Sequence, residues 1–364
     1  MRNLVVALRD PTSVVALNGE EWSALIAVAR AEVLLGTLAH RVAGQLLPPE
    51  VEALLNAARI AADHAQVQAL WEAEMCASAL APLGVRFVLL KGTAYAAAGL
   101  PNADGRQIGD LDILVPRERL DEVEAALRGA GWEWVKDDLY DQGYYRTHMH
   151  ELPPLIHGTR DRMIDVHHTI LPLTARVRPD AAAMVADAIP ASEPPFVSSE
   201  VETPIGSAPT SAPLDCARGK RDSRQYTLSP TDMVCHCAAH MMADGDLAGG
   251  LRNLWDMHCL LSEFDDGGDD FWPVVQARAS HHGLWSAMHC AARLAHELYG
   301  TAIPDSWRIR GNSDFLFLRC LMARDDWGRE TRPLTRLAFY IRSHMLRMPP
   351  LMLIRHLWTK WRAR

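Results

Sequence analysis

The sequence predicts an α+β protein: a mixed sheet with flanking helices, an N-terminal helical module and an all-α C-terminal domain. Residues 81–188 alternate short apolar or β-branched runs with helical stretches, which indicates a sheet and its connecting helices. Residues 1–80 and 230–330 instead have the composition of helices, with Gly and Pro at the points where one helix is expected to end and the next to begin. At 364 residues the chain is long enough for two or three domains.

Residues 1–80 are expected to form a small helical module packed on the sheet. Residues 22–45 and 51–80 are rich in Ala, Leu and Glu, and the segments 18–19 and 47–49 break them with Gly and Pro. We find no chemistry in this module.

The region 81–188 is predicted to hold the catalytic sheet. An apolar strand at 85–90 ends at Lys91 and is followed by an Ala-rich helix start, and a second strand spans 108–115. A helix at 120–129 has acidic residues in its first turns, which suits the helix dipole. Further strands are expected at 132–135 and 162–168.

Three segments follow the sheet. Residues 189–229 are rich in Pro, Ser, Thr and Ala and read as a linker or insertion. Residues 230–330 are expected to form a helical substrate-binding domain, whose first helix has Ser229 as N-cap and Pro230 at its first position. Residues 331–364 contain eight Lys or Arg and no acidic residue, which predicts basic amphipathic helices. We favour packing on the protein with the basic face in water over peripheral contact with an anionic membrane.

The bulk composition sets limits on function. The net charge of −8 argues against broad coating of nucleic acid, so nucleic acid is a less favoured partner. The seven scattered cysteines, without a signal-peptide pattern, predict reduced thiols in a cytoplasmic protein. No apolar stretch reaches the roughly 20 residues of a transmembrane helix.

The most informative motif is Asp110-Leu-Asp112, within the apolar run 108–115. Residues i and i+2 of a strand point to one face, so the two carboxylates stand side by side. Such a pair resists joint ionisation without a cation and suits Mg²⁺ or Mn²⁺. Asp165, in the later strand, would complete a two-metal site. The alternative is a solvated turn preceding a strand.

Basic residues for phosphate binding lie nearby. Lys91, Gly92 and Thr93 join a strand to a helix start, where backbone N–H groups, an ammonium and a hydroxyl would form a phosphate cradle. Arg106 is the candidate for a bidentate clamp on phosphate oxygens. Its alternative role is that of an ordinary exposed loop arginine.

Two groups of His and Cys suggest a zinc site, and we disfavour both. The first group surrounds the third carboxylate; its members are His148, His150, His157, His167 and His168. Carboxylates suit Mg²⁺ or Mn²⁺ better, while zinc requires a closed N/S ligand set. The second group is Cys235, His236, Cys237 and His240. Thiols at i and i+2 of a helix do not face each other, so core packing is favoured there.

A substrate cleft has less specific candidates. His240, Arg252 and Asp256 would line it, although Arg252 and Asp256 at i and i+4 are as readily explained by an ion pair. His150 and His167 would orient a carboxylate or contact phosphate, with packed, hydrogen-bonded histidines as the equal alternative.

These motifs resemble the DNA polymerase β-like nucleotidyltransferases, and more specifically an uncharacterised bacterial family among them. The resembling phrases are L-L-K-G-T-A-Y at 89–95, R-x-x-G-D-L-D-I-L-V at 106–115 and I-D-V-H-H at 164–168. The resemblance covers residues 85–168 strongly and the helical flanks loosely. It implies a polymerase β-like sheet in which Asp110 and Asp112 are the metal-binding pair and Asp165 is the third carboxylate. Gly92 matches the phosphate-loop glycine, while Thr93 departs from the usual Ser or Gly and the spacing to the Asp pair is longer.

The resemblance implies a Mg²⁺-dependent (or Mn²⁺-dependent) transfer of an NMP group from an NTP, with ATP as the expected nucleotide and pyrophosphate released. The expected acceptor is a small molecule, sugar or peptide in a biosynthetic pathway. Two alternatives stay open: modification of tRNA or a protein, as in toxin–antitoxin systems, or a non-catalytic nucleotide-binding accessory protein.

Overall fold

The computed structural model describes residues 1–136, 138–191, 225–243, 247, 250–268 and 270–347. Most of the expected linker, residues 192–224, and the end of the basic segment, residues 348–364, lie outside the described residues. The N-terminal helices are α1 (Arg2–Arg9), α2 (Gly19–Ala31), α3 (Leu35–Arg41) and α4 (Pro49–Leu80). The helices associated with the sheet are α5 (Lys91–Ala97), α6 (Leu120–Gly129), α7 (Leu139–His148) and α8 (Ala181–Ala186).

The described residues form one seven-stranded mixed sheet in the order β3-β4-β5-β2-β1-β7-β6. The strands are β1 (Val88–Leu89), β2 (Asp110–Leu114), β3 (Trp132–Trp134), β4 (Leu155–His157), β5 (Met163–His167), β6 (Ile189–Pro190) and β7 (Tyr226–Thr227). The predicted mixed sheet with flanking helices is confirmed as an α+β arrangement. The expected linker 189–229 is wrong at both ends, because β6 and β7, which flank the segment 192–224, pair with each other at the sheet edge beside β1.

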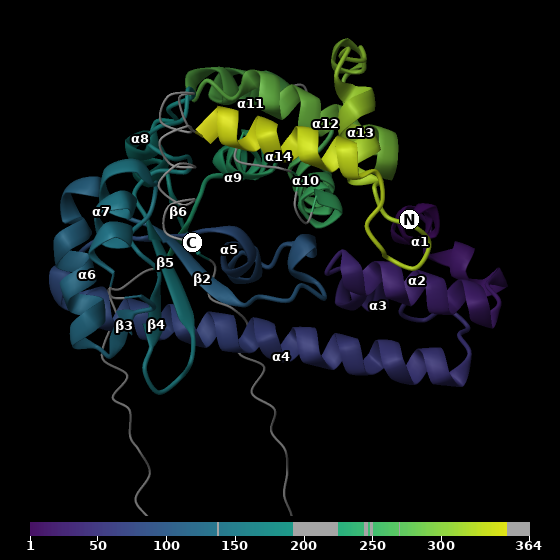
Figure 1. The fold of residues 1–364 in the computed structure, drawn as a ribbon, viewed down its shortest axis with the longest axis horizontal. Coiled ribbons are helices and arrows are strands. Elements are labelled where there is room, and N and C mark those ends of the chain that lie inside the picture. The colour runs from purple at the N-terminus through teal and green to yellow at the C-terminus, as the bar shows by residue number, and fades with distance from the viewer. Residues whose placement is uncertain (137, 192–224, 244–246, 248–249, 269, 348–364) are drawn as a thin grey trace, which may run out of the picture.

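The central pair of strands sets which residues share a face. The strands β2 and β5 run parallel with Asp112 opposite Asp165, while β1 runs antiparallel to β2. Leu111 and Ile113 point away from the carboxylates into a core completed by α4 and α6. One face of the sheet is therefore covered by these two helices, and the other carries the carboxylates (Figure 1).

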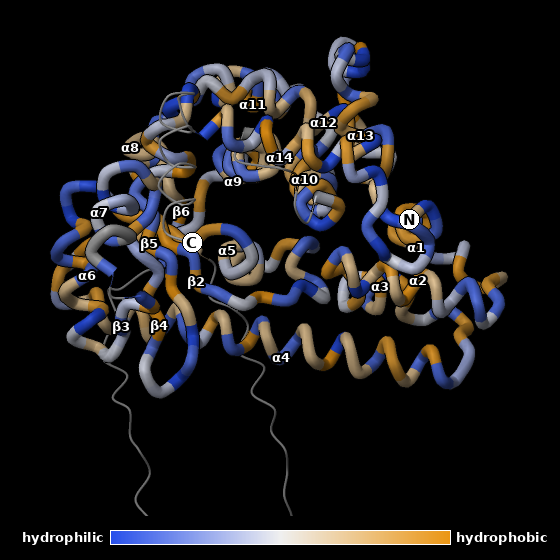
Figure 2. Tube along the Cα trace, viewed as in Figure 1, coloured by the Kyte–Doolittle hydropathy of each residue, from blue (hydrophilic) through white to orange (hydrophobic). Residues whose placement is uncertain are grey.

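The long helix α4 links the N-terminal helices to the sheet. Its buried residues include Leu55, Ala62, Ala69 and Cys76, so a narrow apolar stripe recurs every seven residues along it. Figure 2 shows the resulting alternation of hydrophilic and hydrophobic residues along the helix. Its first half contacts α3 and its last turns cover the sheet, so the boundary expected at residue 80 falls at the end of a helix shared by both regions.

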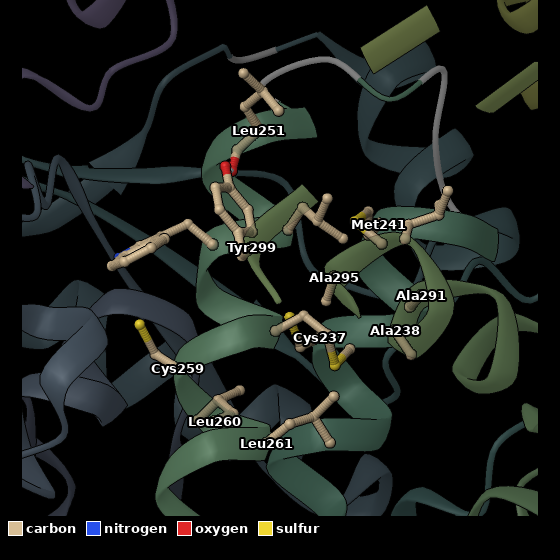
Figure 3. Close-up of a cluster of buried hydrophobic side chains, with 14 of the residues drawn as sticks. Cys237, Ala238, Met241, Leu251, Cys259, Leu260, Leu261, Ala291, Ala295 and Tyr299 are labelled. Carbon is tan, nitrogen blue, oxygen red and sulfur yellow. Dashed lines mark hydrogen bonds between the residues drawn. The ribbon is translucent and has the colours of Figure 1, made fainter. Parts of the chain in front are cut away.

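The C-terminal helices form a second layer above α5 (Figure 1). They are α9 (Pro230–Ala238), a π-helical turn (Ala239–Ala243), α10 (Gly250–Phe264), α11 (Phe271–His281), α12 (Trp285–Tyr299), α13 (Asp314–Leu321) and α14 (Pro333–Arg347). The predicted cap of α9 is confirmed: the Ser229 hydroxyl accepts a hydrogen bond from the Asp232 N–H, and Pro230 is at the first position. Side chains of α9, α10 and α12 interlock in the core, where the Tyr299 hydroxyl donates to the Leu251 carbonyl oxygen (Figure 3).

Helix α14 differs from the expectation of a basic face in water. Its exposed stripe is apolar and consists of Leu334, Leu337, Ile341 and Met345. Arg342 instead lies over the rings of Phe317 and Phe339 and donates to a backbone carbonyl. Guanidinium groups stack on aromatic rings, so Arg342 is held against the protein rather than in water. Among the described residues, no helix has both the length and the hydropathy needed to cross a membrane.

Two glycines allow α3 to approach the loop before β2. A Cβ built on Gly36 would fall far inside van der Waals contact with the carbonyl oxygen of Gly105, which has a φ of +67°. The close approach docks the N-terminal helices on the loop that contains Arg106.

We predict that Gly36→Ala lowers the free energy of unfolding by about 1–3 kcal/mol, because backbone atoms must move apart to admit the methyl group. The matched control is Gly19→Ala, also in a helix, where no atom lies within 4 Å of the added Cβ. Urea unfolding measures both, and equal stability of the two variants would contradict the close contact.

Candidate active site

The three predicted carboxylates meet on one face of the sheet. Parallel pairing sets Asp112 directly beside Asp165, and Asp110 precedes Asp112 by two residues on the same strand. One carboxylate oxygen from each lies within 4.8 Å of the others. Asp112 is buried, Asp165 is half-buried and Asp110 is exposed, so the group opens to solvent at Asp110. The structure thus brings together the residues that the sequence separates by 55 positions.

Lys91 supplies the nearest positive charge. Its Nζ lies 2.6 Å from Asp112 Oδ1, and the Leu90 N–H donates to the Asp112 carbonyl oxygen, which fixes the end of β1 beside β2. Lys91 has a φ of +49°, a left-handed backbone that a side chain adopts only at a cost. Burial lowers the pKa of Lys91, but the three carboxylates raise it overall above its usual value. The lysine is therefore a permanent cation at the site.

Negative charge is shared unevenly among the carboxylates. Burial raises the pKa of Asp112, yet Lys91 and His167 outweigh it and hold that pKa well below its usual range. Burial, with Asp112 and Glu151 nearby, raises the pKa of Asp165 to about 7. Desolvation and Asp112 also raise the pKa of Asp110. Asp165 thus lacks the lysine and histidine contacts that Asp112 has.

The donor set fits a divalent cation. Asp165 Oδ1 is buried and has no hydrogen-bond partner, so one oxygen of the group is left unsatisfied inside the protein. Lys91 brings a single positive charge to three carboxylates, and carboxylate oxygens are the ligands that Mg²⁺ and Mn²⁺ prefer. Asp110, Asp112 and Asp165 would hold such an ion.

The residues of the expected phosphate cradle occupy different environments. The turn residue is Lys91, and Gly92 lies inside the first turn of α5, which corrects the expected glycine turn. Gly92 is needed there because a Cβ would come 2.7 Å from Arg106 Nε. Thr93 is 1% exposed and its hydroxyl is buried without a partner, so the structure does not present it at the surface.

Arg106 is not an exposed loop residue. Its guanidinium pairs with Asp256 and lies 5.5 Å from the Tyr95 ring centre. Its side chain packs directly against the backbone of Gly92. Arg252 approaches Asp256 from the other side, with Nη2 at 2.7 Å from Oδ1. One buried carboxylate therefore joins two arginines.

The expected ion pair of Arg252 with Asp256 is confirmed, and the alternative that Arg252 lines the acceptor cleft is wrong, because the structure places Arg252 in the core. Its remaining N–H groups donate to the Thr37 hydroxyl and the Asn102 carbonyl oxygen, which ties α10 to α3 and to the loop after α5. His240 and Asp256 do line a small cavity together with Lys91, Arg106, Tyr95, His236, Cys237 and Asn253. Its volume of about 20 Å³ is room for roughly one water molecule.

The two other histidines of the expected cleft lie at the carboxylates instead. His167 Nε2 is 2.9 Å from Asp112 Oδ1, and the rings of His150 and His167 are 5.2 Å apart. Burial and the neighbouring His167 lower the pKa of His150 well below its usual value. Glu151 joins them through an isolated antiparallel bridge with His167. No local pattern signals Glu151, because only tertiary pairing brings it to β5.

Cys235 and Cys237 belong to the core, as the packing alternative predicted. Both are buried, and burial raises the pKa of Cys235 to about 12. Figure 3 shows Cys237 among apolar side chains of the C-terminal layer. Among the described residues, neither cysteine is in a group with metal-ligand spacing.

We predict that Asp165 makes stability depend on pH. In the folded state the Asp165 carboxyl has a pKa of about 7, whereas in the unfolded chain its pKa is the usual 3.8. The contribution of this carboxyl to the free energy of unfolding is therefore complete below pH 3.8 and is lost as the pH rises through 7. The side chain of Asp165→Asn is neutral at every pH. Measured with a chelator present, the free energy of unfolding of this variant relative to wild type should therefore rise by on the order of 2 kcal/mol between about pH 5 and pH 8. Urea unfolding at both pH values tests this. The exposed Asp305→Asn should show no such change, and a pH-independent Asp165→Asn difference would refute the prediction.

We also predict that Asp256→Asn lowers the free energy of unfolding by about 3–5 kcal/mol, because it leaves two buried guanidinium groups without their carboxylate. The exposed Asp305→Asn is the control and should change stability by about 0.5 kcal/mol or less. Denaturant unfolding compares them, and similar values would show that the network contributes little.

One family of known proteins is similar to this chain over most of its length. A family described as uncharacterised nucleotidyltransferase matches residues 18–300, which include all three carboxylates, Lys91 and α10. No curated protein and no solved structure matched the chain in the same comparisons. The family match spans well over half of the 364 residues. The chain therefore belongs to this family of uncharacterised nucleotidyltransferases.

Proposed function

We propose that this protein transfers an NMP group from an NTP, with ATP as the expected nucleotide, to a hydroxyl-type acceptor in a Mg²⁺-dependent or Mn²⁺-dependent reaction. The observation that carries the proposal is the in-register pairing of Asp112 with Asp165, with Asp110 on the same face. The sheet around it would be that of the polymerase β-like nucleotidyltransferases, with the site at the start of β2.

The carboxylates would have distinct roles. Asp110 and Asp112 would hold the cation that binds the triphosphate, and with Asp165 they would hold a second. Bound divalent cations supply charge neutralisation at the phosphates and activate an attacking oxygen. In the transfer, the acceptor oxygen bonds to the α-phosphorus, the bond to pyrophosphate breaks and the acceptor loses its proton. Asp165, directly opposite Asp112 on the neighbouring strand, is the carboxylate placed to take that proton.

Lys91 and Arg106 would serve the phosphates differently. Lys91 lies beside the carboxylates, with its Nζ on the buried Asp112, and can act as a point charge on a phosphate. Arg106 is fixed by Asp256, so its charge is positioned before any nucleotide binds. Phosphoryl transfer depends mainly on such positioned charge.

The acceptor would enter from the exposed side of Asp110. The cavity beside His240 and Asp256 admits about one water molecule, so an acceptor does not fit there in this arrangement. We therefore assign Arg252 and Asp256 to holding Arg106 rather than to contact with the acceptor.

We predict that Asp110→Asn reduces Mg²⁺-dependent NTP turnover about 10³-fold or more, since it removes a cation ligand. Asp110 is exposed, so this variant should keep its fold. Pyrophosphate release is measured with the four NTPs, Mg²⁺ or Mn²⁺ and pools of candidate acceptors, beside the 98%-exposed control Asp121→Asn.

Nucleotide binding is measured separately by calorimetry, with and without Mg²⁺. Cation-dependent binding without turnover by any acceptor would favour an accessory role. A wild-type protein that neither binds nor consumes any NTP would refute the proposal. Labelling of RNA or protein in lysate would move the acceptor to a macromolecule.

A further inference from the structure

A second cluster of potential ligands lies behind the carboxylates. Glu151 Oε2 is 3.7 Å from His150 Nε2 and 3.5 Å from His167 Nδ1. Backbone hydrogen bonds hold the cluster: the His168 N–H donates to the His150 carbonyl, and the Leu152 N–H donates to the Val166 carbonyl. The segment with His150 and Glu151 is thus pinned against β5.

Asp112 fixes the orientation of His167. A carboxylate only accepts hydrogen bonds, so the contact of 2.9 Å with Asp112 Oδ1 places the ring proton on Nε2. In the neutral ring, Nδ1 then has a lone pair, and it is buried with no hydrogen-bond partner. This nitrogen lies 3.5 Å from Glu151 Oε2, beyond direct hydrogen-bonding contact.

The spacing of these atoms suits one metal ion. Two ligand atoms at about 2.0–2.1 Å from a tetrahedral zinc lie roughly 3.3 Å apart. The distances from Glu151 Oε2 to His167 Nδ1 and to His150 Nε2, 3.5 and 3.7 Å, are only slightly longer, and one ligand atom of each residue lies within 4.8 Å of the others. Metal-bound histidines commonly donate their other ring N–H to a carboxylate, as His167 does to Asp112.

We propose that His150, Glu151 and His167 form a site for a zinc-like transition dication, separate from the three aspartates. Two imidazoles and one carboxylate select such ions, whereas the all-oxygen aspartate group selects Mg²⁺. Side-chain exposures of 15% for His150 and 16% for Glu151 leave a path for the ion. The site does not depend on the proposed transfer reaction, although the His167–Asp112 contact joins the two groups.

The test uses the full-length protein, stripped of metal and titrated with Co²⁺ in excess Mg²⁺. We expect one equivalent of Co²⁺ to bind with a visible absorption band that Zn²⁺ displaces and Mg²⁺ does not. Glu151→Gln and His150→Ala should each weaken binding at least about 10-fold. Asp110→Asn and the exposed His64→Ala should leave it unchanged. Binding that is insensitive to the first two variants, or lost in Asp110→Asn, would overturn the proposal.

A measurement on the wild type covers the case in which these variants fail to fold. X-ray absorption of protein loaded with one equivalent of Zn²⁺ should show two imidazole nitrogens and carboxylate oxygen around the metal. A shell of oxygen alone would place the ion at the aspartates, and a shell with sulfur would place it at cysteines. Either result would overturn the site.

Discussion

The parallel, in-register pairing of β2 with β5 is the constraint on which the rest of the site depends. It sets Asp112 beside Asp165 on one face and leaves the opposite face to the core. Carboxylates at this separation repel each other when water is partly excluded. Lys91 and His167 offset this repulsion, since both contact Asp112. Lys91 has a positive φ, which is a strained backbone conformation. The pairing of β1 with β2 maintains this strain, because it holds the lysine at the carboxylates.

The contacts to Asp112 create two adjacent donor groups of different chemistry. Lys91 and His167 are both hydrogen-bonded to Asp112 rather than to Asp165. Asp165 is therefore left with one oxygen that has no hydrogen-bond partner, and its pKa is raised. The aspartates therefore remain an oxygen-only group that gains from a hard dication. On the other side, the same contact fixes His167 so that Nδ1 faces Glu151. The hydrogen bond between His167 and Asp112 thus lies between two donor groups: the oxygen-only group of the three aspartates and the nitrogen-rich group of His150, Glu151 and His167.

The helical layers fix the loop that leads into β2. Gly36 and Gly105 permit close backbone approach, while Arg252 bonds to residues of α3 and of the loop after α5. Asp256 completes the link by pairing with Arg106. Such a buried network is favourable only while every charge has its partner, so the N-terminal and C-terminal helices together determine where Arg106 and the start of β2 lie.

The sequence by itself determined the main helical regions, the two strands that carry the carboxylates, the cap at Ser229 and the candidate carboxylates, because periodicity, capping and short motifs are local properties. It also indicated that the cysteines of α9 pack in the core. It missed β4 and placed β6 and β7 in a linker. It did not reveal that Gly92 makes room for Arg106, that Arg252 is internal or that α14 exposes an apolar stripe. Nor did it identify Glu151 as a neighbour of His167. These features arise from contacts between distant segments, such as Arg106 with Asp256 across 150 residues. Only the tertiary structure decided them, because a local pattern states that a residue is buried or polar but not which distant group it meets.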